Sequence, residues 1–375
     1  MARFPLFDMR TLLSALVLVP AFALAAGEPK RPAAREILHT QCLLHAADPK
    51  NPWALAHGLT GIGKNHAARD GRRAADVIIG DFLQKNPSEQ GSPYAFAKFS
   101  ADRTPIEPHP NLLLKSMVEA RIPDSTSFKT PWGEKVTLGE LVKSVQLGFA
   151  HVPMSEGYWL NTGWTLDLLG ARLTPKNARF KNRAGEEIDF NKVMDDALAY
   201  LELAQAPIAE GMDKGLAEVP KRKQGIYAHS CGGLHLVQAI NAWARFPEVK
   251  KRWGKRLDRQ IDVLFYRLGS EQRQYDAALA QAPQYKLQLL TQMLKFYGHF
   301  LETTGRLKAE NGFKPTVAQK RSIEHAKALL DHATTELQVM GAFETMEQIK
   351  KSHPQVFLDL IGDACHAAHG LSYWK

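Results

Sequence analysis

The chain is poor in cysteine and carries no familiar catalytic signature. Its 375 residues include three cysteines, Cys42, Cys231 and Cys365. Because this number is odd, at least one thiol must be free, bound to a metal or paired with another molecule. The sequence has no P-loop, no Gly-x-Ser-x-Gly, no His-Glu-x-x-His and no Cys-x-x-Cys-His. Nucleotide chemistry and the commonest hydrolase and metalloprotease mechanisms therefore have no support in the sequence.

Long apolar runs are absent beyond the first 25 residues. The N-terminus combines Arg3 and Arg10 with an apolar run over residues 12–24, which ends at the small-residue pattern Ala23-Leu24-Ala25. This is the pattern of a secretory signal peptide, and the run is short for a membrane span. We predict that residues 1–25 are removed on export, that no transmembrane segment remains after this cleavage, and that the protein is periplasmic or secreted.

The chain also lacks the basic stripe that is typical of nucleic-acid-binding proteins. Lys and Arg number 48 against 39 Asp and Glu, which gives a formal net charge of +9. The basic residues are scattered among acidic ones and form no stripe with aromatic side chains. We therefore predict no nucleic-acid partner. The positive net charge is consistent with a soluble protein. It is also consistent with a protein that is attracted to an anionic polymer of the cell envelope.

Strand signals are almost absent, and nearly all of the chain after residue 25 has the pattern of α-helices. Capping boxes mark two helix starts, Thr137 with Glu140 and Thr316 with Gln319. One kind of helix begins with aromatic, His or small polar residues and is rich in Ala and Gly: residues 53–64, 109–120, 157–171, 229–246, 285–303 and 356–371. The other kind is amphipathic: residues 73–85, 137–149, 190–204, 257–280 and 316–339. A further helix is expected over residues 33–46.

The alternation of these two kinds of helix predicts an all-α fold. A helix that is apolar on most sides needs protein around it, and an amphipathic helix shields it from water on one face. A closed ring of about six helical hairpins, the α/α toroid, meets this need. An open α-solenoid is the alternative, and it leaves both ends exposed. Pairing of the first helix with the last is the main support for closure. We expect one domain over residues 26–375.

In a toroid, the ends of the inner helices border a central funnel. Polar residues that are not assigned to the surface lie at such ends: His57, His109, Trp159, Trp164, His229, Cys231, His366 and His369. This funnel is the place where we expect chemistry.

Two Cys-x-x-x-His spacings point to a metal. Cys231 is followed by His235, and Cys365 by His369 with His366 between them. Residues four apart lie on one face of a helix, so each pair could converge on one ion. Thiolates and imidazoles in this number are the ligands that zinc favours. Two alternatives remain open, a Cys231–Cys365 disulfide and buried cysteines beside histidines that bond to backbone carbonyls.

These same stretches resemble the zinc elements of lanthionine cyclases. That family combines an α/α toroid with a zinc ion held by one Cys in a glycine-containing turn and by a Cys-His pair in a later turn. Cys231-Gly232-Gly233 and Cys365-His366 look like those two elements. The resemblance implies the toroid fold and a zinc ion.

A second constellation lies in residues 155–167, SEGYWLNTGWTLD. Aromatic side chains can stack on sugar rings. In a pair of carboxyl groups, one can protonate the leaving group of a substrate and the other can activate a water molecule. The acid–base candidates are Glu156 and Asp167, with His109 and His229 as further catalytic candidates. The substrate-binding candidates are Trp159 and Trp164 as platforms, with Asn161 and His57 beside them. The alternative is that both Trp residues belong to the core and Asp167 to the surface.

Three functions remain open from the sequence. The first is binding or cleavage of a cell-envelope saccharide or peptide by general acid–base chemistry, as in a glycoside hydrolase or polysaccharide lyase, since many α/α toroids have these activities. The second is a zinc enzyme that activates water through Cys and His ligands. The third is a non-catalytic binding or scaffold protein.

Overall fold

The computed structural model describes residues 32–374, except 89–90, 155–156, 221–226 and 228–230. The chain separates into two units, Met1–Pro32 and Ala33–Lys375, and the second unit contains all the helices and strands described below. The predicted signal peptide lies outside the described residues. Within the described part, no helix has the length and apolar character needed to cross a membrane.

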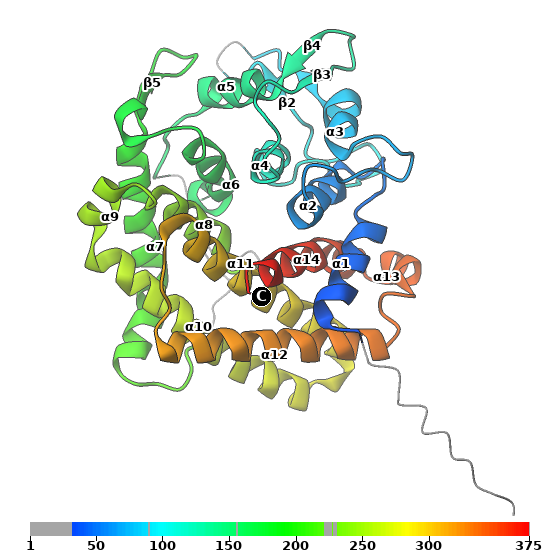
Figure 1. Cartoon of the computed structure of the whole chain (residues 1–375), viewed down its shortest axis with the longest axis vertical. Coiled ribbons are helices and arrows are strands. Elements are labelled where there is room, and N and C mark those ends of the chain that lie inside the picture. Colours follow the sequence, from blue (N-terminus) through cyan, green and yellow to red (C-terminus); the bar gives the residue numbers. More distant parts are fainter. Residues whose placement is uncertain (1–31, 89–90, 155–156, 221–226, 228–230, 375) are drawn as a thin grey trace, which may run out of the picture. The chain divides into compact units, whose positions relative to one another are not determined.

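The second unit is all-α, as predicted, and six of its helices contact one another in a closed cycle (Figure 1). Each helix of this cycle contacts the next, and the last contacts the first. In order, they are α2 (Pro52–Ile62), α4 (Leu112–Glu119), α6 (Tyr158–Gly170), α8 (Leu234–Trp243), α11 (Lys286–Asn311) and α14 (Pro354–Ser372). These helices correspond to the six that the sequence marked as rich in Ala and Gly. We call them the inner helices.

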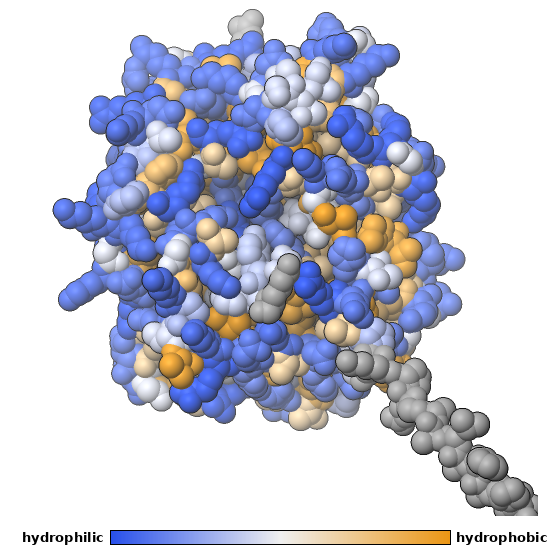
Figure 2. Space-filling model, viewed as in Figure 1, coloured by the Kyte–Doolittle hydropathy of each residue, from blue (hydrophilic) through white to orange (hydrophobic). Residues whose placement is uncertain are grey.

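A second set of helices packs outside the inner ones. In the described residues it comprises α1 (Ala34–His45), α3 (Ala74–Phe82), α5 (Leu138–Gly148), α7 (Phe190–Asp213), α10 (Lys255–Gln281) and α12 (Val317–Val339). Here α3 contacts α2, α5 contacts α4 and α6, α7 contacts α6 and α8, α10 and α12 contact α11, and α1 contacts α14 and α2. All are predicted helices. Figure 2 shows one face of the molecule, which is mostly hydrophilic with small hydrophobic groups.

Helix ends agree with the expected capping chemistry, and two starts differ for a backbone reason. Thr137 and Thr316 both cap their helices, in the predicted boxes with Glu140 and Gln319. The helix predicted from residue 109 begins at Leu112 because Asn111 has φ 64°. The one predicted from residue 229 begins, within the described residues, at Leu234. Gly232 and Gly233 before it have φ 59° and 76°, a conformation in which glycine costs least.

The sequence analysis missed several small elements. Two short helices, α9 (Pro247–Trp253) and α13 (Met346–Ser352), connect longer ones. Three two-stranded antiparallel sheets also form: β1 (Gln84–Lys85) with β2 (Tyr94–Ala95), β3 (Ser127–Lys129) with β4 (Lys135–Thr137), and β5 (Arg179–Lys181) with β6 (Glu187–Asp189). The last two hairpins directly precede α5 and α7, and each turns at a glycine with positive φ, Gly133 and Gly185.

The first and last helices are joined covalently. Cys42 of α1 and Cys365 of α14 form a disulfide, with their Cα atoms 4.9 Å apart. Gly61 of α2 lies against both, because a Cβ at this position would be 2.8 Å from the Cys42 Sγ. The pairing of the chain's first and last helices is therefore confirmed. The prediction of Cys365 as a metal ligand, and the alternative of a Cys231–Cys365 disulfide, are both wrong, because Cys365 already has Cys42 as its partner.

Candidate functional site

Along five of the inner helices, the residues that line one cavity come before those that line a second cavity. On α11, Lys295 and His299 line the larger cavity, and Arg306 lines the smaller one. On α6 the same order holds for Trp164 and Asp167. Since α4, α8 and α14 repeat this order, the two cavities lie at opposite ends of the inner helices.

The larger cavity has a volume of about 780 Å³ and a lining rich in groups that can carry chemistry. Its titratable and aromatic lining residues include His57, His109, Trp164, Cys231, His235, Lys295, His299, Asp359, Asp363 and His366. Six of the residues predicted from the sequence are in this list: His57, His109, Trp164, Cys231, His235 and His366.

Three buried histidines from three different helices meet in this cavity. His235 of α8, His299 of α11 and His366 of α14 each offer one nitrogen, and these three atoms lie within 4.8 Å of one another. The ring centroids of His299 and His366 are 4.2 Å apart, and that of His235 is 5.1 Å from the first and 5.5 Å from the second. We call these residues the histidine triad. Such a group could hold a metal ion.

Two of the three rings are held in one orientation by bonds to Nδ1. Nδ1 of His299 lies 2.9 Å from the backbone carbonyl of Lys295, and Nδ1 of His366 lies 3.0 Å from the Glu302 carboxylate. A carbonyl and a carboxylate accept hydrogen bonds, so each Nδ1 donates its hydrogen and Nε2 keeps a lone pair. This is how metal-ligating histidines are usually oriented.

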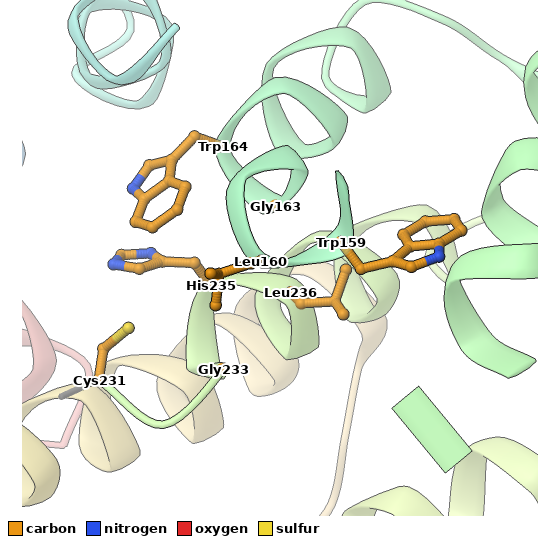
Figure 3. Close-up of a pocket in the computed structure, with 8 residues that line it drawn as sticks. All are labelled: Trp159, Leu160, Gly163, Trp164, Cys231, Gly233, His235 and Leu236. Atoms are coloured by element: carbon orange, nitrogen blue, oxygen red, sulfur yellow. The ribbon is translucent and has the colours of Figure 1, made fainter. Parts of the chain in front are cut away.

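The third ring, His235, packs against Trp164. The two ring centroids are 4.5 Å apart with their planes tilted by 38°, and Trp164 also stacks on the parallel ring of His109 at 4.1 Å. In Figure 3, Trp164 and His235 point to one side, where the sulfur of Cys231 points towards His235, while Trp159 points the other way. Nδ1 of His235 is buried and has no hydrogen-bond partner among the described residues. A ligand in the cavity would satisfy an otherwise unpaired imidazole.

Burial keeps two of the triad imidazoles, those of His235 and His299, neutral near pH 7. It lowers the pKa of His235 well below the usual value, and it lowers the pKa of His299 to about 3, with the neighbouring His366 adding to the effect. The pKa of His57, whose ring is 5.2 Å from that of His366, is also lowered well below the usual value by burial. Neutral imidazole is the form that binds metal, so no proton has to be displaced from His235 or His299 near pH 7.

A lysine and two aspartates line the cavity beside the triad. Lys295 Nζ lies 2.8 Å from Asp359 Oδ1 and 3.7 Å from Asp363 Oδ2. Burial raises the pKa of Asp363 well above the usual value; Lys295 opposes this shift and Asp359 adds to it. The cavity therefore holds one ammonium beside two carboxyl groups.

Glu302 links the triad to the other end of the inner helices. Its side chain is fully buried, and it accepts hydrogen bonds from His366, from His369 at 2.8 Å and from Gln238 at 3.0 Å. Burial alone would raise its pKa, but His366 and His369 hold the pKa well below the usual value. The group is therefore a carboxylate that orients two imidazoles.

The smaller cavity, of about 290 Å³, is dominated by buried ion pairs. Arg306 binds Asp167 through two hydrogen bonds of 2.7 and 2.9 Å, and Lys115 Nζ lies 2.7 Å from Glu119. Glu119, Glu302 and His369 also approach one another within 4.8 Å. Two cations, Lys115 and Arg306, already neutralise this acidic group, so a further cation gains less there than at the histidine triad.

The other predicted site residues that the structure describes lie outside the larger cavity. Asp167 belongs to the smaller one. Trp159 is 4% exposed and stacks on Tyr200 in the apolar core. The Asn161 side chain donates to the backbone carbonyl of Gly157. Glu156 and His229 lie outside the described residues. The proposed pair of acid–base carboxyl groups therefore has one member at the far end of the inner helices.

The sequence analysis overlooked four residues that the structure places in or beside the triad. They are Lys295, His299 and Glu302 of α11 and Asp363 of α14. A signal was present: Lys295, His299, Glu302 and Arg306 follow one another at intervals of four, three and four residues in a helix that is otherwise largely buried and apolar. Such spacing places polar groups on one inward face.

Comparison of the chain with protein-family models, curated proteins and solved structures found no match.

Proposed function

We propose that residues 33–375 form an α/α toroid of six helical hairpins and that its larger cavity is the site of a zinc-dependent hydrolase. The closed cycle of contacts between the six inner helices supports the ring, as does the disulfide between the first and last helices. An open solenoid has no contact between its first and last repeats.

The histidine triad is the observation that carries the proposal. Three imidazoles with room for a fourth ligand are the donor set of a catalytic zinc site, in which the open position takes water or substrate. Nδ1 of His366 donates to a carboxylate and that of His299 to a carbonyl, the outer contacts that tune such ligands. When bound, zinc would supply an activated water near neutral pH.

The acid–base hypothesis for a saccharide has less support. Asp167 is held by Arg306 in the smaller cavity, and Trp159 lies in the core. The ring of Trp164 already packs against the rings of His109, at 4.1 Å, and His235, at 4.5 Å, which leaves less of its surface for a sugar ring. We therefore favour a substrate with an ester or amide bond, such as an envelope peptide, over a saccharide.

Metal analysis tests the metal site directly. The mature protein, purified without chelator, is expected to contain one zinc per chain. The variants His299→Ala and His366→Ala should each lose at least tenfold in zinc affinity, measured by competition with a chromophoric chelator. His325→Ala is the matched control, because His325 is exposed and bonds to Gln272 on the outer helices. Equal zinc affinity in all four proteins would overturn the metal site.

Hydrolysis needs its own assay. The zinc-loaded protein should hydrolyse members of a panel of esters and short peptides. This activity should be lost after treatment with a chelator and restored by added zinc. Stoichiometric zinc without turnover of any ester or peptide would overturn the hydrolase and leave only a metal-binding protein. Export remains part of the proposal, and sequencing the N-terminus of the mature protein tests it: cleavage near residue 25 is expected.

A further inference from the structure

One turn away from the histidine triad, three charged or acidic side chains form a separate group. Lys295 precedes His299 by four residues on α11, and Asp363 precedes His366 by three on α14. Asp359 lies a further turn back. All three line the larger cavity and are buried; the side chain of Asp363 is 4% exposed. They share the cavity with the triad without belonging to it.

The charges of this group do not balance if both aspartates are ionised. Lys295 contributes one positive charge, and it lies closer to Asp359, at 2.8 Å, than to Asp363, at 3.7 Å. Among the described residues of the other packed elements, Tyr275 of α10 interacts with Asp363 and Cys231 with Lys295, and neither of the two adds a positive charge. An uncompensated buried carboxylate is costly, so the group retains one proton. The carboxyl further from the ammonium, Asp363, is where that proton resides, and burial, which raises its pKa, acts in the same direction.

The proton on Asp363 is available to a ligand. The Oδ2 atom of Asp363 is buried at the cavity wall and has no hydrogen-bond partner among the described residues. Asp359 differs, because it is bonded by Lys295, Gln355 and Gln292. A substrate oxygen or nitrogen in the cavity would give Asp363 a hydrogen-bond partner in addition to its longer contact with Lys295.

We propose that Asp363 is the general acid of this site and protonates the leaving group of the substrate. The proposal rests on the hydrolase proposed above. When the activated water attacks the carbonyl carbon, the bond from that carbon to the leaving oxygen or nitrogen breaks, and Asp363 gives this atom its proton. One of the two protons of the attacking water then returns to Asp363. The sum is the addition of one water to the substrate.

A spectroscopic experiment tests where the proton is. The infrared difference spectrum between wild type and Asp363→Asn at pH 7 should contain the C=O stretch of a protonated carboxyl. A second variant tests the charge balance. In Asp359→Asn, Asp363 is the one carboxyl group left beside Lys295 and should ionise, so this variant should lack the same C=O band. Asp258→Asn, which changes an exposed carboxyl of α10, is the control and should keep the band. If the Asp363→Asn difference spectrum lacks it, the proposal is wrong.

A leaving-group comparison tests what the proton does. A p-nitrophenyl ester departs without protonation, whereas an ethyl ester needs it. Because general acid catalysis contributes typically 10²–10⁴-fold, Asp363→Asn should lower kcat for the ethyl ester about 100-fold or more and for the p-nitrophenyl ester less than about tenfold. Equal losses on both esters would overturn the role. Zinc content and wild-type turnover report separately on the proposed hydrolase.

Discussion

The Oε2 atom of Glu302 lies 3.0 Å from Nδ1 of His366, in a position where none of the Glu302 side chain reaches solvent. The same carboxylate also accepts a bond from His369. A buried carboxylate that holds an imidazole by its Nδ1 fixes which nitrogen is left for a ligand, and it makes that nitrogen more basic. Glu302 therefore affects how strongly His366 can bind a metal ion as a member of the triad.

Glu302→Gln should weaken zinc binding about 10–100-fold, the usual cost of losing such an outer contact. The amide keeps the size of the side chain but loses the negative charge and can no longer accept equally from both histidines. Competition titration with a chromophoric chelator measures the affinity. Glu324→Gln, an exposed position on α12, should bind zinc like wild type. Unchanged affinity in Glu302→Gln, with an unchanged thermal transition, would argue against the triad as the metal site.

Removal of the disulfide should destabilise the protein by about 2–5 kcal/mol, because the bond closes a loop across 323 residues of the unfolded chain. The double variant Cys42→Ser/Cys365→Ser is compared with wild type by urea unfolding without reductant. Cys231→Ser serves as the control, since Cys231 is outside the disulfide. Coincident unfolding curves for the double variant and wild type would contradict the expectation.

Asp167→Asn separates a structural role from a catalytic one. Asp167 accepts two buried hydrogen bonds from Arg306, and the amide weakens both at a cost of about 1–3 kcal/mol, while Arg306 keeps its ion pairs with Glu119 and Glu310. We expect this loss in urea unfolding, with zinc content unchanged. The control, Asp124→Asn, breaks the largely exposed pair with Arg172 and should cost no more than about 1 kcal/mol. A loss of kcat at wild-type stability would instead revive Asp167 as an acid–base residue.

Local chemistry made most of the helices predictable. The caps at Thr137 and Thr316 and the alternation of apolar and amphipathic segments depend on residues close together in the chain, and the structure confirms them. The hairpins before α5 and α7 were missed because strands of three residues carry too little periodicity. The repeated Phe-Lys-x-x-x-Gly-Glu at Phe128 and Phe180 was the available signal.

The site was harder to predict because its parts come from helices that are far apart in the sequence. No short sequence spacing relates His235, His299 and His366. They come together only because α8, α11 and α14 pack against one another. The choice of Cys42 as the partner of Cys365 depends in the same way on α1 packing against α14. Trp164 and Asp167 are the opposite case, because residues that are close in the sequence were wrongly predicted to share one site. They are three residues apart, about 4.5 Å along the helix axis, and line different cavities.

Acid should destabilise the zinc-free protein through its buried histidines. His299 has its pKa lowered to about 3 by burial and by His366, whereas an unfolded histidine titrates near 6.5. Below pH 6.5, His299 therefore binds a proton in the unfolded chain but not in the folded protein. The free energy of unfolding falls as the pH falls towards 3. Each such histidine contributes a slope of about 1.4 kcal/mol per pH unit in this window.

Urea unfolding of chelator-treated protein between pH 7 and pH 4 measures this slope. His299→Gln removes one titrating group, so its stability should fall less steeply than that of wild type, by about 1.4 kcal/mol per pH unit. His325→Gln should leave the slope unchanged, because His325 is exposed in the folded protein. Parallel profiles for wild type and His299→Gln would mean that His299 is protonated in the folded apoprotein, and a metal would then have to displace a proton to bind there.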